Sequence, residues 1–180
     1  NNSYNELFIN PNGWVGFDND VAAWDNTGIP TNQISGAAIF GLWDDLNPVN
    51  ENCNQYCSGN VYYHSNSERF VIWFNEVAHW LTYFENTFYD FQIVIYPTGK
   101  VDINYRNIDG NYDASVGIQK NSNVGSQVIF GADGLSNNFN VTFESAPEWL
   151  TTNPNQGTLL DNQNQTITIT SESDDIDGTY

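Results

Sequence analysis

Acidic and amide side chains occur in short clusters that could bind a hard cation. One cluster is Asp18 and Asp20 on either side of an asparagine, and a second is Asp44 and Asp45 with Asn47. Carboxylate and amide oxygens from loops are the ligands that Ca²⁺ prefers in proteins. Because both clusters adjoin the ends of expected strands, we predict Ca²⁺ as a ligand there. The alternative is that these acids are solvated turn residues that cap backbone amides.

A third acidic cluster, Asp174 and Asp175 with Asp177, lies in a polar tail of the sequence. Binding a cation there would cost the entropy of ordering that tail. Asp44 and Asp45 instead follow the most apolar run of the chain, where the backbone is expected to be rigid. We therefore expect these two acids to matter most for any cation.

Aromatic residues offer a second kind of binding chemistry. We predict that Trp24, Trp80, Tyr83 and Phe84 contact a ligand, because aromatics are too numerous here for one small core. Trp and Tyr side chains stack on sugar rings and anchor protein interfaces. The expected partner is an extracellular polymer or a protein. The alternative is that large side chains simply fill the core and the rims of a thin fold.

The two cysteines, Cys53 and Cys57, are separated by three residues in the segment ENCNQYCSGN. A zinc site would need two more ligands close by, and His64 alone does not supply them. We therefore predict a local disulfide between Cys53 and Cys57. Such a bond is typical of an oxidising, extracellular setting.

No catalytic signature accompanies these residues. The sequence has two histidines and lacks a GxSxG elbow, an HExxH motif and a phosphate-binding glycine loop. His79 is expected at a strand end, packed against rings and hydrogen-bonded locally. Paired carboxylates at glycosidase spacing depend on the fold rather than on sequence distance. We expect a protein that is not an enzyme.

The charge balance excludes whole classes of partner. Asp and Glu number 22 against 4 Lys and Arg, which gives a net charge of −18. Nucleic-acid binders need the opposite sign, so no nucleic-acid partner is expected. No run approaches the roughly eighteen apolar residues of a membrane span, so no membrane insertion is expected. The chain begins at Asn1 without an initiator Met, and we expect it to be part of a larger multidomain chain.

The elements that must position these residues are short strands. Aromatic and β-branched residues alternate with polar ones, and Asn, Gly and Pro mark the turns between them. We predict an all-β fold, an antiparallel two-sheet β-sandwich. The expected strands are 7–9, 14–17, 37–43, 59–64, 69–77, 87–96, 101–105, 115–119, 126–130 and 139–143.

The character of the sequence changes near residue 146, where aromatics become sparse. Residues 1–145 are predicted to form the sandwich, and 146–180 a linker with an incomplete immunoglobulin-like β module. Residues 166–170 alternate Thr and Ile, which is typical of a strand. Either the second module continues outside this sequence, or its last strand docks on its first.

Six motifs follow one another in a recognisable order: INPNGWVGF, IFGLWDDLNP, GNVYYH, RFVIWFNEVAHW, TFYDFQIVIYPTGKVDINY and SVGIQ. Their succession resembles β-sandwich modules of very large secreted or cell-surface proteins of marine Bacteroidetes and, more distantly, the extracellular domain of nidogen. The segment PEWLTTNPNQGTLLDNQNQTITIT is similar to the start of a BACON-like immunoglobulin module. The resemblance implies a secreted or cell-surface location and a sandwich architecture, and it implies no particular activity.

Three hypotheses of function remain open at this stage. The leading one is a non-catalytic extracellular module that mediates adhesion or attachment to a substrate or polymer. The second is an accessory or pro-region fragment of a secreted hydrolase, such as a protease. The third is a structural subunit of a surface assembly, which would associate with itself in solution.

Overall fold

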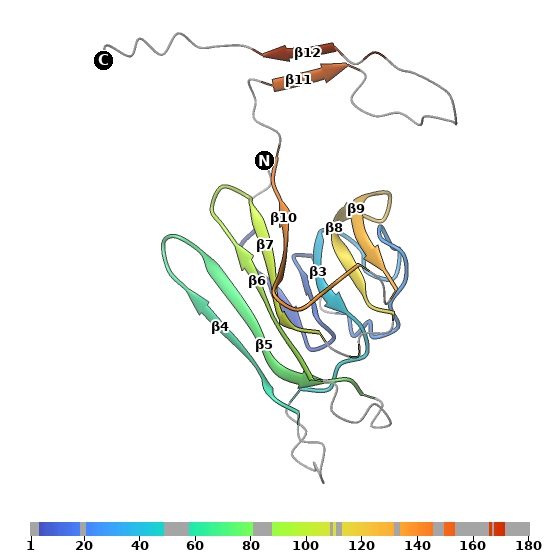
Figure 1. Ribbon diagram of the computed structural model, residues 1–180, viewed down its shortest axis with the longest axis vertical. Coiled ribbons are helices and arrows are strands. Elements are labelled where there is room, and N and C mark those ends of the chain that lie inside the picture. The colour runs from blue at the N-terminus through green and yellow to red at the C-terminus, as the bar shows by residue number, and fades with distance from the viewer. Residues whose placement is uncertain are drawn as a thin grey trace. The chain divides into compact units, whose positions relative to one another are not determined.

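Two five-stranded antiparallel sheets face each other in the computed structural model (Figure 1). The structure describes residues 4–18, 21–48, 58–80, 88–108, 110, 113–131, 134–145, 150–153, 166 and 168–171. None of these residues lies in a helix, and none belongs to a helix able to cross a membrane. The prediction of an all-β sandwich is confirmed.

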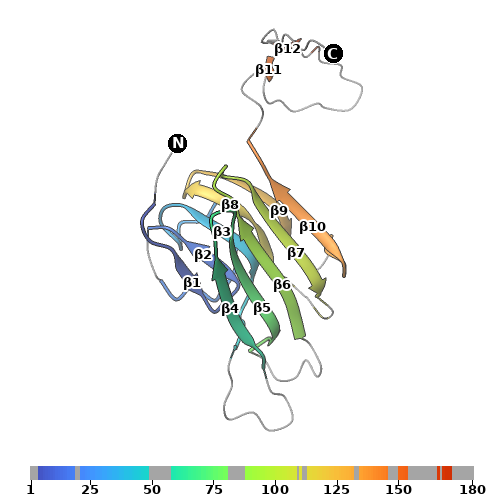
Figure 2. The same cartoon turned by 90° about the vertical axis from the view of Figure 1, so that its left-hand side faces the viewer.

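The first sheet has the strand order β1-β2-β3-β8-β9 and the second the order β10-β7-β6-β5-β4. In Figure 2 the strands of the second sheet lie in front of the strands of the first sheet. The strands are β1 (Phe8–Asn10), β2 (Trp14–Gly16), β3 (Ala38–Trp43), β4 (Asn60–Ser65), β5 (Phe70–Ala78), β6 (Phe88–Ile95), β7 (Val101–Asn107), β8 (Ser115–Asn121), β9 (Val124–Phe130) and β10 (Phe139–Phe143). Each expected strand is present, with ends that differ by up to two residues.

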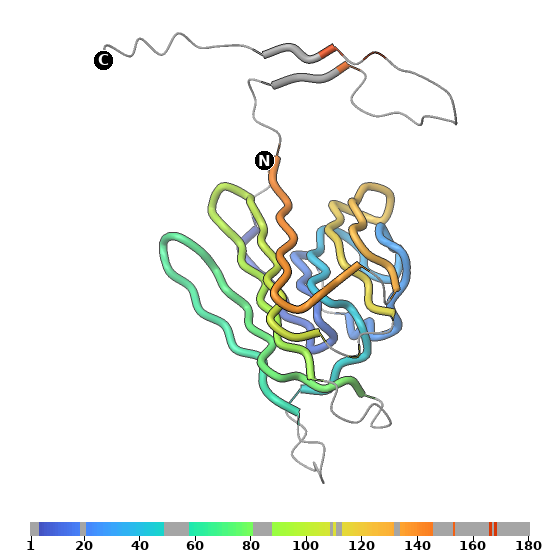
Figure 3. Tube along the Cα trace, viewed as in Figure 1, coloured from blue at the N-terminus to red at the C-terminus, as the bar shows by residue number. Residues whose placement is uncertain are grey.

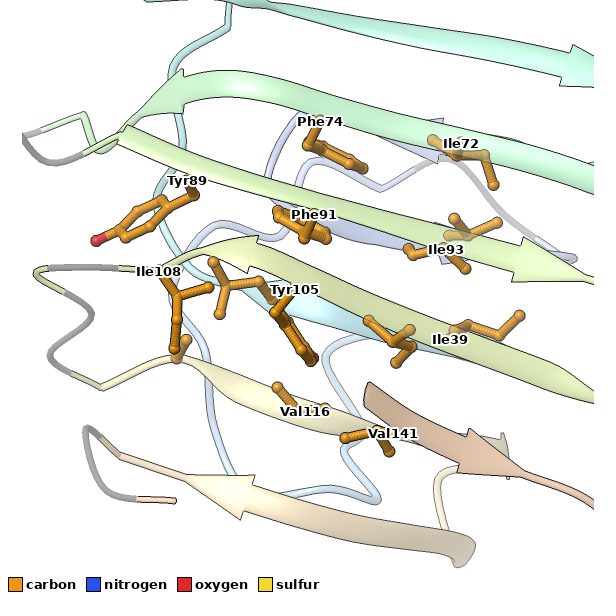
Figure 4. Close-up of a cluster of buried hydrophobic side chains, with 14 of the residues drawn as sticks. Ile39, Ile72, Phe74, Tyr89, Phe91, Ile93, Tyr105, Ile108, Val116 and Val141 are labelled. Atoms are coloured by element: carbon orange, nitrogen blue, oxygen red, sulfur yellow. The ribbon is translucent and has the colours of Figure 1, made fainter. Parts of the chain in front are cut away.

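Side chains of alternating strand positions build the core between the layers. Figure 4 shows Phe74, Phe91 and Tyr105 from the second sheet beside Ile39 and Val116 from the first. Phe74 and Phe91 stack with ring centroids 4.5 Å apart. The period of two along each strand therefore places one apolar set inside and the intervening residues outside.

Strand β3 is buried along its whole length, as its continuous apolar sequence predicts. It lies at the centre of the first sheet, paired with β2 on one side and β8 on the other. Its last residue, Trp43, packs on Phe40 with ring centroids 5.0 Å apart. Trp43 is thus a core residue, in agreement with the alternative that large side chains fill the core.

Contacts divide the chain into two compact units, Asn1–Phe143 and Glu144–Tyr180. In the second unit, β11 (Leu150–Asn153) pairs antiparallel with β12 (Thr168–Ser171). The sequence does not predict β11, because Leu150-Thr-Thr-Asn lacks a repeated apolar alternation. The predicted immunoglobulin-like character of this unit stays a prediction.

Candidate functional site

The segment after β3 crosses from the first sheet to the second at one end of the sandwich. Leu46 and His79 form an isolated antiparallel bridge. Around it, the amide of Asn47 donates to the carbonyl of Ala78 at 2.9 Å, and the amide of Trp80 donates to the carbonyl of Asp45 at 2.7 Å. The tube in Figure 3 follows this crossing from β3 to the end of β5. The bridge fixes the backbone on both sides of a candidate site.

The turn between β1 and β2 supports the same segment from the other side. The Asn12 side chain accepts a hydrogen bond from the amide of Leu46 at 3.1 Å, and its carbonyl accepts one from Asp44 at 3.3 Å. Gly13 has a φ of +80°, and its carbonyl accepts the amides of Gly41 and Leu42, each at 3.0 Å. The expected Asn-Gly hairpin turn therefore also fixes the backbone of the segment from Asp44 to Leu46.

Trp24 is placed by the loop that precedes it. The carbonyl of Ala23 accepts hydrogen bonds from the indoles of Trp14 at 3.0 Å and Trp43 at 3.1 Å. Both indoles are fully buried, so they fix this point of the loop firmly. Two residues earlier, the carbonyl of Val21 accepts the side-chain amide of Asn10 at 2.8 Å. Trp24 comes directly after Ala23, and its side chain is 55% exposed.

These supports bring Trp24 and Trp80 to one open pocket of about 550 Å³, which we call the two-tryptophan pocket. Trp80 is 56% exposed, like Trp24. The pocket is lined by Pro11, Asn12, Ala22, Trp24, Asp45, Leu46, Asn47, Pro48 and Trp80. Two of the predicted cation ligands, Asp45 and Asn47, thus lie beside two of the predicted aromatic contacts. The site combines apolar ring surface with a carboxylate and an amide.

Asp44 and His79, the chain neighbours of the pocket residues Asp45 and Trp80, form a buried pair, which is an ion pair when the ring is protonated. Asp44 is only 4% exposed, and its Oδ1 is 3.3 Å from Nε2 of His79. The same oxygen accepts the amide of Asp45 at 2.8 Å. Oδ2 of Asp44 is buried and has no hydrogen-bond partner in the described part of the chain. Nε2 of His79 thus contacts a residue thirty-five positions away, because the bridge at Leu46 brings the segment after β3 to the end of β5.

Neighbouring charges shift the titration of this cluster. Burial of the ring lowers the pKa of His79, but the hydrogen bond to Asp44 and the charges of Asp44, Asp45 and Asp113 outweigh it and raise the pKa overall. Burial raises the pKa of Asp45, His79 opposes that effect, and Asp44 adds to it. Burial and the charge of Asp44 also raise the pKa of Asp113. Proton uptake by this cluster is therefore favoured in the folded protein.

The other predicted cation cluster does not join this site. Asp18 lies before β3, where its carboxylate accepts the amide of Ala37 at 2.9 Å. Asp44 follows the opposite end of β3, and six extended residues separate such ends by about 20 Å. Asp18 therefore caps a backbone amide, and its predicted role as a cation ligand stays a prediction. Asp20, Tyr83, Phe84, Cys53, Cys57 and the acids at 174–177 lie outside the described residues.

The roles of two residues that build the site have no signal in the sequence. The sequence predicts His79 only as a packing residue, and no pattern links it to Asp44. The sequence predicts Asn12 only as a turn residue, although its side chain also accepts the amide of Leu46. Among the described residues, no three His, Cys, Asp or Glu side chains are grouped as a metal site.

A comparison with protein families gives the relationship of the chain. The model of a family described as NIDO-related matches residues 1–170. The chain belongs to the NIDO-related family. The predicted likeness to nidogen is thereby confirmed, while the Bacteroidetes origin and the BACON-like segment stay predictions. Comparisons with curated proteins and with solved structures found no match.

Membership gives the general character of the molecule. NIDO-related domains are extracellular modules, and such modules are generally non-catalytic. The two-tryptophan pocket of this NIDO-related chain lies in the first unit, Asn1–Phe143.

Proposed function

We propose that this chain is a non-catalytic attachment module of a larger secreted or cell-surface protein, and that it holds an extracellular polysaccharide in the two-tryptophan pocket. The observation that supports the proposal most is the convergence of Trp24 and Trp80, two half-exposed indoles from separate elements, on one pocket. Indole faces stack on the apolar faces of sugar rings. Asp45 and Asn47 offer oxygens and an amide to sugar hydroxyls.

Charge and pocket chemistry favour an uncharged sugar over other ligands. A net charge of −18 disfavours phosphates and acidic polymers. The pocket volume of about 550 Å³ falls within the range of small-ligand sites and suits a short stretch of a sugar chain. Among the described residues that line the pocket, Asp45 is the one carboxylate. Acid–base hydrolysis of a glycosidic bond uses a pair of carboxylates, so the lining supports binding rather than cleavage.

Substituting either tryptophan is expected to weaken polysaccharide binding about tenfold or more. Loss of one ring–sugar stack removes about 1.4 kcal/mol or more, which corresponds to a factor of ten in Kd. The measurement is affinity electrophoresis and titration calorimetry with soluble β-1,3-glucan, β-1,4-glucan, β-1,4-mannan and xylan. The variants are Trp24→Ala and Trp80→Ala.

Val128→Ala is the matched control, because Val128 is an exposed apolar side chain that is not among the pocket-lining residues. The control should bind as the parent does. Equal binding by the parent and both tryptophan variants would remove the pocket from the proposal. A parent that binds none of the four polymers would refute polysaccharide attachment.

Calcium is the second ligand proposed for this end of the sandwich. It is supported by the buried Oδ2 of Asp44, which lacks a described partner, and by Asp45 next to it. A ligand that binds only the folded state at about 100 times its Kd adds about 2.7 kcal/mol to the free energy of unfolding. Millimolar Ca²⁺ is thus expected to raise Tm by several degrees over a chelator at matched ionic strength.

The double variant Asp44→Asn with Asp45→Asn should abolish that shift in Tm. The variant Asp18→Asn serves as the control, since Asp18 caps Ala37 at the other end of β3. An unchanged Tm of the parent on adding Ca²⁺ would mean that these acids bind no calcium. A shift that persists in the double variant would place the cation elsewhere.

A further inference from the structure

The outer face of the second sheet carries a row of side chains that the two-tryptophan pocket does not use. Tyr62, Trp73, Gln92, Asn104 and Asn140 are successive register partners across β4, β5, β6, β7 and β10. We call them the transverse row. Their chain neighbours Ile72, Phe91 and Ile103 are buried in the core, so the row faces outward. Five strands at about 4.8 Å spacing make the row about 19 Å long.

The aromatic end of the row is held in a fixed orientation. Nε1 of Trp73 donates to Oδ1 of Asp90 at 2.8 Å. Arg106 donates from Nη1 to the other oxygen of Asp90 at 3.0 Å. Asp90 is 4% exposed, so this carboxylate is bonded to Trp73 and Arg106 and is hardly accessible to solvent. Tyr62 lies next to Trp73, with ring centroids 5.8 Å apart. A ring surface fixed before binding loses little side-chain entropy on contact with a ligand.

The polar end of the row presents amide groups. The side-chain nitrogen of Asn140 donates to Oδ1 of Asn104 at 2.8 Å, which leaves the nitrogen of Asn104 directed to no described acceptor. The Gln92 side chain makes no hydrogen bond within the described part of the chain. Each primary amide offers both donors and an acceptor. These groups match the hydroxyls of a sugar, which also donate and accept.

The surface beside the row is hollowed rather than flat. A pocket of about 290 Å³ is lined by Trp73, Gln92, Asn104 and Arg106 among others. A second pocket of about 510 Å³ adjoins it and shares Asp90 and Arg106. The smaller hollow borders the ring of Trp73 and the amides of Gln92 and Asn104, and the larger one lies beyond Asp90 and Arg106. The smaller hollow gives a ligand on the row a place to seat a ring.

We propose that the transverse row is a second binding surface, which takes an uncharged polysaccharide chain lying across the strands. The row contains rings and amides and no ionised group, in a protein whose net charge is −18. An acidic polymer would find one exposed cation there, Arg106, already paired with Asp90. A neutral chain meets no such repulsion, and the row is long enough for several sugar rings. This surface involves none of the residues that line the two-tryptophan pocket.

Titration calorimetry of the whole chain with the same four soluble polymers tests the row. The variants are Tyr62→Ala and the double variant Gln92→Ala with Asn104→Ala, all at positions that make no hydrogen bond to the core. Each is expected to weaken binding of at least one polymer about tenfold. Asn32→Ala with Gln33→Ala is the matched control, because it removes two exposed amides from a loop of the first sheet.

The test is repeated with Trp24→Ala and Trp80→Ala present, so that the two surfaces are scored separately. Row variants that weaken binding in both backgrounds support the proposal even if the tryptophan variants have no effect. Row variants that bind as their control does overturn it, whatever the pocket does. A parent that binds none of the four neutral polymers overturns it as well, and would leave the row to a protein partner.

Discussion

Gly13→Ala is expected to lower the free energy of unfolding by about 3 kcal/mol or more. Gly13 has a φ of +80°, where an L side chain costs about 1–2 kcal/mol. A Cβ at this position would lie 1.9 Å from the carbonyl oxygen of Leu42, which is backbone of the buried strand β3. The turn must therefore shift, and the two hydrogen bonds that the Gly13 carbonyl accepts would weaken. Urea denaturation followed by circular dichroism measures the loss.

Gly99→Ala separates the two causes. Gly99 has a φ of +85°, but nothing lies within 4 Å of its Cβ position. It should cost only the backbone contribution of about 1–2 kcal/mol. Equal losses for the two variants would show that the approach of Leu42 is easily relieved. A larger loss for Gly13→Ala should come with weaker ligand binding at the two-tryptophan pocket, because Asn12 holds Leu46 from the same turn.

At pH 5, where the His79 ring is protonated, His79→Ala is expected to cost about 3–5 kcal/mol, because it leaves the buried carboxylate of Asp44 without its charged partner. For a chain of this length, such a loss lowers Tm by about 6–20 °C. His79→Gln keeps a donor for Asp44 without a titrating ring, so it should cost less. Differential scanning calorimetry should give the highest Tm for the parent, a lower Tm for His79→Gln and the lowest for His79→Ala. A Tm of His79→Ala equal to that of the parent would mean that Asp44 is neutral or otherwise satisfied.

The same pair sets the direction of the pH dependence. The pKa of His79 is raised in the folded state, so its contribution to stability is complete below the unfolded value of about 6.5. That contribution is lost as the pH rises through the folded pKa. Asp45 and Asp113 also have raised pKa values, so their protonated forms favour folding and stability falls as they ionise above about pH 4. All three groups predict a protein that is more stable at pH 5 than at pH 8.

Asp102 limits the stability of the protein at low pH. Burial raises the pKa of Asp102, but hydrogen bonds from Thr142 and Lys100 outweigh it and lower the pKa. Its contribution is present above the unfolded value of about 3.9 and is lost as the pH falls through the folded pKa. Thermal melts from pH 3 to pH 9 at fixed ionic strength should therefore show a maximum on the acid side of neutrality. In His79→Gln, the part of the decline above pH 6.5 should be missing.

Strand positions could be predicted from the sequence because each rests on a local signal. The alternation of Phe70, Ile72 and Phe74 with more polar neighbours identifies β5, and Asn-Pro-Asn-Gly marks the turn between β1 and β2. The continuous apolar run of β3 correctly indicated burial on both faces. These signals lie within a few consecutive residues, so they do not depend on how distant parts of the chain come together.

The site could be predicted only in its parts. Trp24, Asp45 and Trp80 were each named, but their meeting depends on long-range contacts that leave no pattern in the sequence. The carbonyl of Ala23 is held by two buried indoles, and Leu46 pairs with His79 across thirty-three residues. The partnership of Asp44 with His79 was missed for the same reason. The bond between the Asp18 carboxylate and the amide of Ala37 also has no signal in the sequence.

The pairing of β10 with β7 has a mechanical consequence. Phe139 lies opposite Tyr105, and Phe143 lies opposite Val101, so the chain leaves the sandwich at the end away from Ala78 and Trp80. A polymer held beside Trp80 and a tether attached after Phe143 would pull the module along its strands. The hydrogen bonds between β10 and β7 run perpendicular to that pull, so they would share the load and rupture together rather than one by one. The module would therefore resist a pulling force between its bound polymer and the chain after Phe143 in the direction in which paired strands are strongest.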